Sequence, residues 1–190
     1  MNEEIFTRVT TIANLFSDFS SIDKDVLEAA AIRGTDVHKL CAAQAQGFLV
    51  SACPEIYQGY LDSFSQWANE NIDSIILCEH RRFCRRYMIT GEVDFVVKMK
   101  GEETLTLIDI KTSAARYSSW DLQMGGYNYL LKETFPALEI EKALLIRLKK
   151  DGGKPIVNRV SDLDAAEDVF FHAFECYNYM KMKPKKIEVE

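Results

Sequence analysis

Two charged side chains, Asp109 and Lys111, stand in the segment LIDIKT, whose other residues are mostly isoleucine and leucine. Successive side chains of a β-strand point to opposite faces, so these two share one face while Ile108 and Ile110 point into the core. Charges in an apolar strand are costly unless they are paired, hydrogen-bonded or bound to a metal. The segment therefore predicts that some polar group or metal ion meets them.

The segment GEVDFVVKM, just upstream, supplies a second carboxylate, Asp94. If the two segments form a hairpin that turns at residues 101–102, counting along the ladder places Asp94 opposite Asp109. Directly opposed side chains have Cβ atoms about 4.5 to 5.5 Å apart, so the two carboxylates would repel one another. A divalent cation between them would remove that conflict.

The chemistry that such a face offers is phosphodiester hydrolysis. Two carboxylates that hold Mg²⁺ can activate a water molecule and neutralise charge on a scissile phosphate. The ammonium of Lys111 can orient that water or stabilise the transition state. By spacing alone, a surface hairpin in which Lys111 forms a cross-strand salt bridge with one aspartate fits equally well.

Helices are predicted for the first third of the chain. Apolar residues recur at helical spacing over about 22–49, in two segments that meet at Gly34, where Gly-Thr-Asp offers a break and a new N-cap. Pro54 stands where a first helical turn tolerates it, and a third helix follows to about Asn71. These helices precede the strands that carry the charged face.

From Ser74 the pattern changes to short β-rich segments, which predict an antiparallel meander. Ser118 and Asp121 fit a capping box at the start of the helix that follows the meander. Two further strands and a closing helix complete the pattern, which predicts an α/β fold with a central mixed sheet flanked by helices. The predicted segments are 75–80, 83–89, 91–99 and 105–112 for the meander, 142–150 and 156–160 for the later strands, and about 163–182 for the last helix.

The composition is that of one globular domain. The chain has 190 residues, 47% hydrophobic and 27% charged, and a chain of this size buries about two-thirds of its surface in one core. We expect a helical part over about 1–73, the catalytic sheet and helices over about 74–182, and a basic tail over 183–190. The net charge of −6 argues against a generally phosphate-coating protein but allows a local basic patch.

The compartment is predicted to be the cytoplasm, without membrane association. The N-terminus has acids where a signal peptide has bases, and no run of about 18 apolar residues occurs. The five cysteines form no CxxC pair, and their odd number suits reduced thiols.

Four short motifs give the chain a resemblance to a known family. GEVD, then DIKT after a short hairpin, then QMGGY on the next predicted helix, resemble the PD-(D/E)XK nuclease superfamily. An upstream RGTDVH, from Arg33 to His38, is similar to a motif of its RecB-like and phage-type exonuclease branch. The resemblance covers about Arg33 to Tyr127 and implies a restriction-endonuclease-like fold, in which the core hairpin carries the active site.

The resemblance also implies roles for individual residues. The metal ligands would be two carboxylates, a backbone carbonyl and a histidine; a lysine would be catalytic, and a glutamine and a tyrosine four residues apart would position the site or a phosphate. A glutamate near the metal is the loosest of these correspondences. The ligands would be Asp94, Asp109, the backbone carbonyl of Ile110 and His38. Lys111 would be the catalytic lysine, Gln123 and Tyr127 the positioning pair, and Glu79 the glutamate near the metal.

By the same resemblance, the expected function is a Mg²⁺-dependent DNA exonuclease of recombination or repair, of phage type, with Mn²⁺ able to substitute. The alternatives are a structure-specific endonuclease and a non-catalytic DNA-binding protein. Partners would be DNA, a single-strand annealing protein and other copies of the chain, without the sequence indicating whether these form a ring. An iron–sulfur cluster is not expected, because only Cys176 follows Tyr127 whereas cluster-bearing members place three cysteines there.

Two features have two interpretations each. Gly125 and Gly126 lie inside a predicted helix, where each costs roughly 1 kcal/mol, so they indicate close approach either by substrate or by a packing neighbour. Arg81, Arg82 and the arginines that follow them either contact phosphates or form a solvated strand face.

Overall fold

The computed structural model describes residues 5–48, 50 and 52–182, and within these residues six strands form one sheet. The strands are β1 (Thr7–Arg8), β2 (Ile72–Cys84), β3 (Ile89–Met99), β4 (Leu105–Lys111), β5 (Ile140–Arg147) and β6 (Ile156–Arg159). The helical elements are α1 (Val9–Ala13), the 3-10 turn η1 (Asn14–Phe16), α2 (Lys24–Ala45), α3 (Glu55–Asn71), α4 (Ser119–Thr134) and α5 (Leu163–Lys181). The predicted basic tail lies outside the described residues.

The sheet is mixed. Strands β2, β3 and β4 form the predicted antiparallel meander, β5 runs parallel to β4 after the α4 crossover, and β6 is antiparallel to β5. The short β1 pairs in parallel with the start of β3. The predicted fold class, a central mixed sheet flanked by helices, is confirmed. No helix in the described part of the chain is long and apolar enough to span a membrane.

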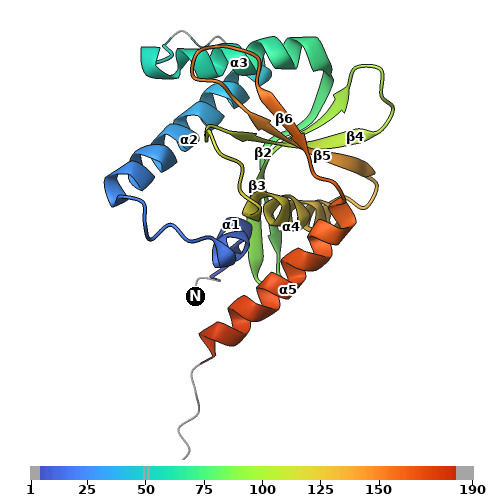
Figure 1. The fold of residues 1–190 in the computed structure, drawn as a ribbon. Helices are drawn as coiled ribbons and strands as arrows, with labels where there is room; N and C mark the ends of the chain where they lie inside the picture. The colour runs from blue at the N-terminus through green and yellow to red at the C-terminus, as the bar shows by residue number, and fades with distance from the viewer. Residues whose placement is uncertain (1–4, 49, 51, 183–190) are drawn as a thin grey trace, which may run out of the picture.

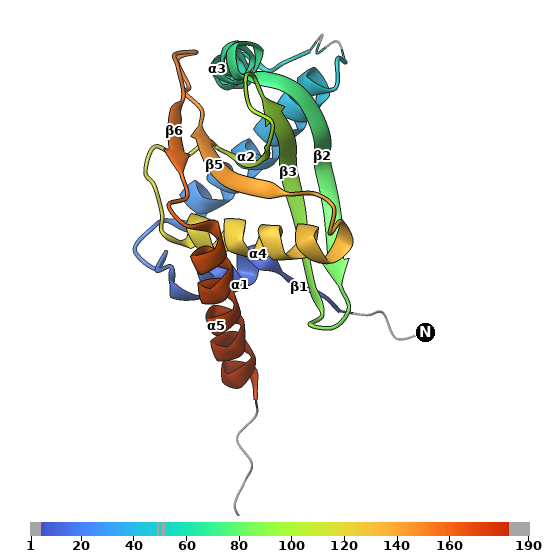
Figure 2. The ribbon, with the colours of Figure 1, turned by 90° about the vertical axis from the view of Figure 1, so that its right-hand side faces the viewer.

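Helices cover both faces of the sheet (Figure 1). On one face, α1, α4 and α5 form a core that includes Leu107 of β4. On the other face, α2 and α3 pack against Ile108 and Ile110. This alternation along β4 is the one that LIDIKT predicts, and it directs Asp109 and Lys111 toward α4. Figure 2 shows α4 lying across the strands β2 and β3.

The β3–β4 hairpin has the predicted register but a longer loop. Phe95 pairs with Ile108, so one step further along the ladder Asp94 stands opposite Asp109. The loop, however, spans residues 100–104 and is not a two-residue turn.

The loop residues bond both across the turn and to other elements. The backbone N–H of Glu102 donates to the carbonyl of Met99 at 3.1 Å, and Glu103 pairs with Lys98. The carboxylate of Glu102 pairs with the ammonium of Lys142 on β5. The ammonium of Lys100 donates to the backbone carbonyl of Asn69 at the end of α3. These contacts tie the loop to α3 and β5.

The predicted break at Gly34 is wrong, because α2 is one helix of 22 residues. Glycine lowers the stability of a helix interior by about 1 kcal/mol, but it does not end a helix whose other residues are held by packing. Val37 and Cys41, which follow Gly34 on α2, are fully buried in the core on the α2–α3 face of the sheet. That burial holds the helix through the glycine.

The predicted separation of 75–80 from 83–89 is also wrong. Strand β2 continues unbroken through Arg81 and Arg82, and the turn follows at 85–88. Both arginines have partners along the strand: Arg81 pairs with Glu92 of β3, and the guanidinium of Arg82 lies 4.4 Å from the ring centroid of Phe135. Polar residues with such partners do not interrupt a strand.

The predicted capping box of α4 is not formed. The helix begins at Ser119 as expected, but the side chain of Ser118 makes no capping hydrogen bond. The carboxylate of Asp121 instead accepts two hydrogen bonds from Arg116, at 2.6 and 2.7 Å. The guanidinium of Arg116, a charged donor, thus takes the place of the backbone N–H of Ser118 as the partner of Asp121.

The two glycines of α4 have a packing role. A Cβ on Gly125 would lie 2.2 Å from the carbonyl oxygen of Ala166 on α5, and a Cβ on Gly126 would lie 2.7 Å from the side chain of Val9 on α1. These contacts decide between the two interpretations of the glycines in favour of helix packing.

We expect Gly125→Ala to lower the free energy of unfolding by about 1 to 3 kcal/mol or more, because the new methyl group overlaps a backbone that cannot move aside. Gly34→Ala is the matched control, since a Cβ there meets nothing within 4 Å. It should raise stability by up to about 1 kcal/mol through helix propensity. Urea denaturation measures both, and a destabilised Gly34→Ala would contradict an unbroken α2.

Candidate active site

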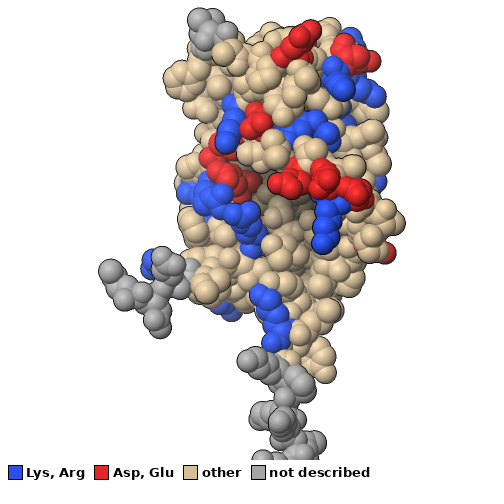
Figure 3. All heavy atoms as spheres, turned by 90° about the vertical axis from the view of Figure 1, so that its left-hand side faces the viewer, with Lys and Arg blue, Asp and Glu red and all other residues tan. Residues whose placement is uncertain are grey.

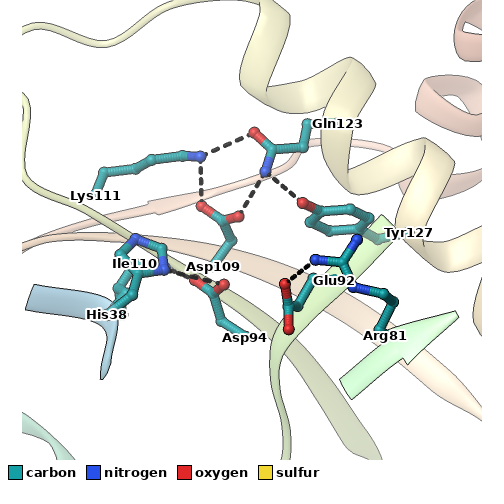
Figure 4. A network of polar contacts seen from close by, with 9 residues as sticks. All are labelled: His38, Arg81, Glu92, Asp94, Asp109, Ile110, Lys111, Gln123 and Tyr127. Atoms are coloured by element: carbon teal, nitrogen blue, oxygen red, sulfur yellow. Dashed lines mark hydrogen bonds and ion pairs between the residues drawn. The ribbon is translucent and has the colours of Figure 1, made fainter. Parts of the chain in front are cut away.

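A cleft of about 360 Å³ opens between α2, the start of α1 and the polar side of the sheet. Predicted site residues from five elements line this cleft. Figure 4 shows most of these side chains turned toward one another. The predicted residues that line it are His38 from α2, Glu79 from β2, Asp94 from β3, Asp109 from β4, and Gln123 and Tyr127 from α4.

The carboxylate of Asp109 is held by two partners on its own side of the sheet. Asp109 is 1% exposed, and its Oδ2 lies 2.6 Å from Nζ of Lys111. Its Oδ1 accepts a hydrogen bond of 2.8 Å from Nε2 of Gln123. The amide oxygen of Gln123 accepts from Lys111 at 2.8 Å, so the three side chains form a closed triangle (Figure 4).

Tyr127 extends this triangle. The same amide nitrogen of Gln123 donates to the hydroxyl oxygen of Tyr127 at 2.9 Å, because the two residues are one helical turn apart. The ring of Tyr127 lies over β3 at Gly91, where a Cβ would come within 2.7 Å of it. Because Gly91, the glycine of the GEVD motif, has no side chain, α4 can approach the active site.

Burial sets the ionisation of this group. Burial raises the pKa of the Asp109 carboxyl, and the adjacent ammonium of Lys111 opposes that rise. Burial also raises the pKa of Tyr127 well above its usual range, so its hydroxyl stays protonated at neutral pH. The chain thus keeps a cation beside a carboxylate within reach of the cleft.

Asp94 is held from the opposite side. It is 5% exposed; its Oδ2 accepts a hydrogen bond of 2.8 Å from the backbone N–H of Ile110, and its Oδ1 lies 3.2 Å from Nδ1 of His38. Burial by itself would lower the pKa of His38, but the nearby carboxylates outweigh it and raise that pKa to about 9. In the absence of a metal ion, His38 is therefore a protonated partner of Asp94.

Glu79 has the least satisfied side chain of the cleft. It stands opposite Asp94 on β2, between the paired residues Cys78–Phe95 and His80–Val93. Its backbone has a φ of 46°, which is rare for a residue with a side chain. Its Oε1 is buried without a hydrogen-bond partner among the described residues, and burial together with Asp94 raises its pKa to about 7.

These donors fit a divalent cation. One donor atom each from His38, Glu79 and Asp94 lie within 4.8 Å of one another. Two carboxylates and an imidazole suit Mg²⁺ or Mn²⁺, and the buried, unpartnered oxygen of Glu79 is what a bound cation would satisfy. Asp109 is not in this close group, and its two oxygens meet Lys111 and Gln123.

Basic and acidic side chains lie side by side on the face of the molecule that Figure 3 shows. Arg8, Lys39 and Arg81 line the cleft. Of the predicted arginine cluster, Arg81 reaches this lining through its pair with Glu92, whereas Arg82 packs on Phe135. Lys39 could have been inferred from its place next to His38, but nothing in the sequence around Arg8 indicated the cleft.

The family of the protein follows from its sequence and fold together. Residues 10–185 match the PD-(D/E)XK nuclease superfamily, and the chain belongs to that superfamily. No match was found among curated proteins. The predicted restriction-endonuclease-like fold is confirmed, whereas membership of the RecB-like and phage-type branch stays a prediction.

Two solved structures resemble the chain. A candidate exonuclease from Eubacterium rectale aligns over 97% of this chain and 91% of its own length, with 7% identity and a TM-score of 0.52. The protein SSO0001 aligns over 98% of this chain and 81% of its own, with 14% identity and a TM-score of 0.47. The first of these likenesses supports the fold.

We expect Mg²⁺ or Mn²⁺ to raise the melting temperature of the protein, because a ligand that binds the folded state stabilises it. The Glu79→Gln variant should lose most of that rise in melting temperature. A ten-fold weaker affinity for the metal removes about 1.4 kcal/mol of the stabilisation that the metal provides. In EDTA at pH 8, above the pKa of about 7, the variant should be at least as stable as the parent, because a neutral amide relieves the repulsion by Asp94.

Differential scanning fluorimetry with and without metal measures both effects. Glu92→Gln is the control, since Glu92 lines the same cleft but is paired with Arg81 and lies outside the close donor group. An unchanged metal-induced shift in Glu79→Gln would contradict a metal at this position.

Proposed function

We propose that the protein is a metal-dependent exonuclease that hydrolyses phosphodiester bonds of DNA and acts as a single nuclease domain. The observation that carries the proposal is the position of the His38–Glu79–Asp94 donor group in one open cleft with Asp109. Lys111 lies in the wall of the neighbouring hollow and pairs with Asp109 there. A metal site alone or an ion pair alone has many uses. Their combination supplies what phosphodiester hydrolysis requires.

Three residues of the donor group would hold the cation: His38, Glu79 and Asp94. Asp109 and the carbonyl of Ile110 would complete the set, since a carboxylate oxygen bonded to Lys111 keeps a further lone pair for a metal. When bound, Mg²⁺ or Mn²⁺ would lower the pKa of a water molecule and neutralise charge on the phosphate.

Lys111 would orient the attacking water and stabilise the negative charge that develops on the phosphate. Its ammonium is placed for this by Asp109 on one side and the amide oxygen of Gln123 on the other. Gln123 is in turn held by Tyr127. Gln123 and Tyr127 thus act as positioning residues, and attack of water on the phosphodiester leaves a 5′-phosphate, as in related nucleases.

The basic rim supports a nucleic acid as substrate. Arg8, Lys39 and Arg81 line the cleft although the whole chain carries a net charge of −6. Cations gathered around an acidic floor attract a phosphate backbone to the one place where it can be cleaved.

The choice of an exonuclease over an endonuclease rests on likeness. The motif order is similar to that of RecB-like and phage-type exonucleases, and the Eubacterium rectale protein is itself a candidate exonuclease. By the same likeness we propose a role in recombination or repair in the cytoplasm. A single-strand annealing protein and further copies of the chain are the proposed partners.

The test is digestion of linear and covalently closed circular duplex DNA, labelled at known positions, in Mg²⁺, Mn²⁺ or EDTA. We expect metal-dependent loss of the linear DNA alone, with the end label giving the polarity. Lys111→Ala should lower the rate at least about 100-fold, because it removes electrostatic stabilisation of the transition state.

Lys98→Ala is the matched control, because Lys98 lies on neighbouring β3 in an exposed pair with Glu103. It should cleave at the parental rate. Cleavage of the circle would identify an endonuclease, and binding of DNA without cleavage in either metal would identify a non-catalytic DNA-binding protein.

A further inference from the structure

A second hollow, of about 440 Å³, lies directly beside the metal cleft. Its walls are the segment from η1 to the start of α2, the middle of α2, and the connection from β4 to α4. Gly34 and His38 line both hollows, so the two are neighbours. We call this second hollow the aromatic pocket, after Phe19, Tyr117 and Trp120 in its walls.

The three rings line the pocket as a connected series. The centroids of Phe19 and Tyr117 are 6.2 Å apart with the rings inclined at 63°, and those of Tyr117 and Trp120 are 5.5 Å apart at 66°. Aliphatic side chains of Ile22 and Leu27 also line it. Its volume lies in the range of about 300 to 1,000 Å³ that is typical of small-molecule sites. Flat, apolar walls of this kind suit a heteroaromatic ring.

Cations lie where the pocket meets the active site. Arg33 donates to the hydroxyl of Thr112 at 3.4 Å, and Nζ of Lys111 lies 5.2 Å from the ring centroid of Trp120. None of the described residues that line the pocket is acidic. One end therefore suits a phosphate and the other an apolar ring, which is the division of charge within a nucleotide.

We propose that the aromatic pocket binds one unpaired nucleobase of the DNA strand whose phosphate lies at the metal cleft. This inference rests on the proposed nuclease function and specifies its substrate. A base that is stacked and paired in a duplex cannot enter a pocket, so it must first leave the helix. The protein therefore prefers single-stranded DNA, or ends that fray, over intact duplex.

The test uses single-stranded oligonucleotides that carry one abasic residue at successive positions, with kcat/KM measured in Mg²⁺. For the parent protein, one position next to the cleaved bond should lower kcat/KM about 10-fold, the factor expected when one stacked base is lost. Tyr117→Ala should lower kcat/KM on unmodified DNA to a similar extent. In this variant, an abasic residue at the sensitive position should lower kcat/KM no further. Tyr117→Phe, which keeps the ring, should retain the parental pattern.

Two further variants distinguish loss of the pocket from loss of folding. Ala31→Leu narrows the pocket from an exposed position on α2 without removing a packed ring, and it should reproduce the pattern of Tyr117→Ala. Phe16→Ala removes an aromatic ring of η1 that is 71% exposed and outside the pocket, and it should behave as the parent does.

The outcomes separate this inference from the function on which it rests. If the parent cleaves DNA but no abasic position lowers kcat/KM, the base pocket is overturned and the nuclease stands. Equal kcat/KM on blunt duplex and single strand would also overturn it. If the parent cleaves no DNA in Mg²⁺ or Mn²⁺, the proposed function fails and the base pocket fails with it.

Discussion

The buried pair of Asp109 and Lys111 is the interaction on which the rest of the site depends. A carboxylate that is 1% exposed is strongly disfavoured unless it has a cation and hydrogen-bond donors at hand. The ammonium of Lys111 and the amide of Gln123 supply them. Helix α4 must therefore cross β4 at the height of Asp109, which fixes where α4 lies.

The position of α4 in turn constrains the elements that pack against it. For α4 to reach Asp109, the ring of Tyr127 must lie against β3, and Gly91 leaves the space for it. On its outer side α4 packs against the backbone of α5, and Gly125 makes that approach possible. On the opposite side of the cleft, α2 brings His38 to Asp94. Helices on both sides of the sheet thus converge on two neighbouring carboxylates.

The simpler interpretation of LIDIKT, a surface hairpin with a cross-strand salt bridge, is met only in part. Lys111 does form an ion pair, but its partner is Asp109 of its own strand, which is 1% exposed. The donor group of His38, Glu79 and Asp94 lies beside that pair and leaves one buried oxygen without a partner. A hairpin with a salt bridge alone does not account for a strained glutamate turned toward another carboxylate.

The sequence by itself determined the elements whose cause is local. Alternation in β4 placed Asp109 and Lys111 on one face, and the count along the hairpin placed Asp94 opposite Asp109. The tertiary structure decided what depends on distant partners: α2 continues through Gly34 because Val37 and Cys41, which follow it, are buried, and Arg81 stays in β2 because Glu92 pairs with it. The tertiary structure also placed Arg8 at the cleft and formed the aromatic pocket. Neither could be predicted, because contacts between segments far apart in the chain leave no periodic pattern in the sequence.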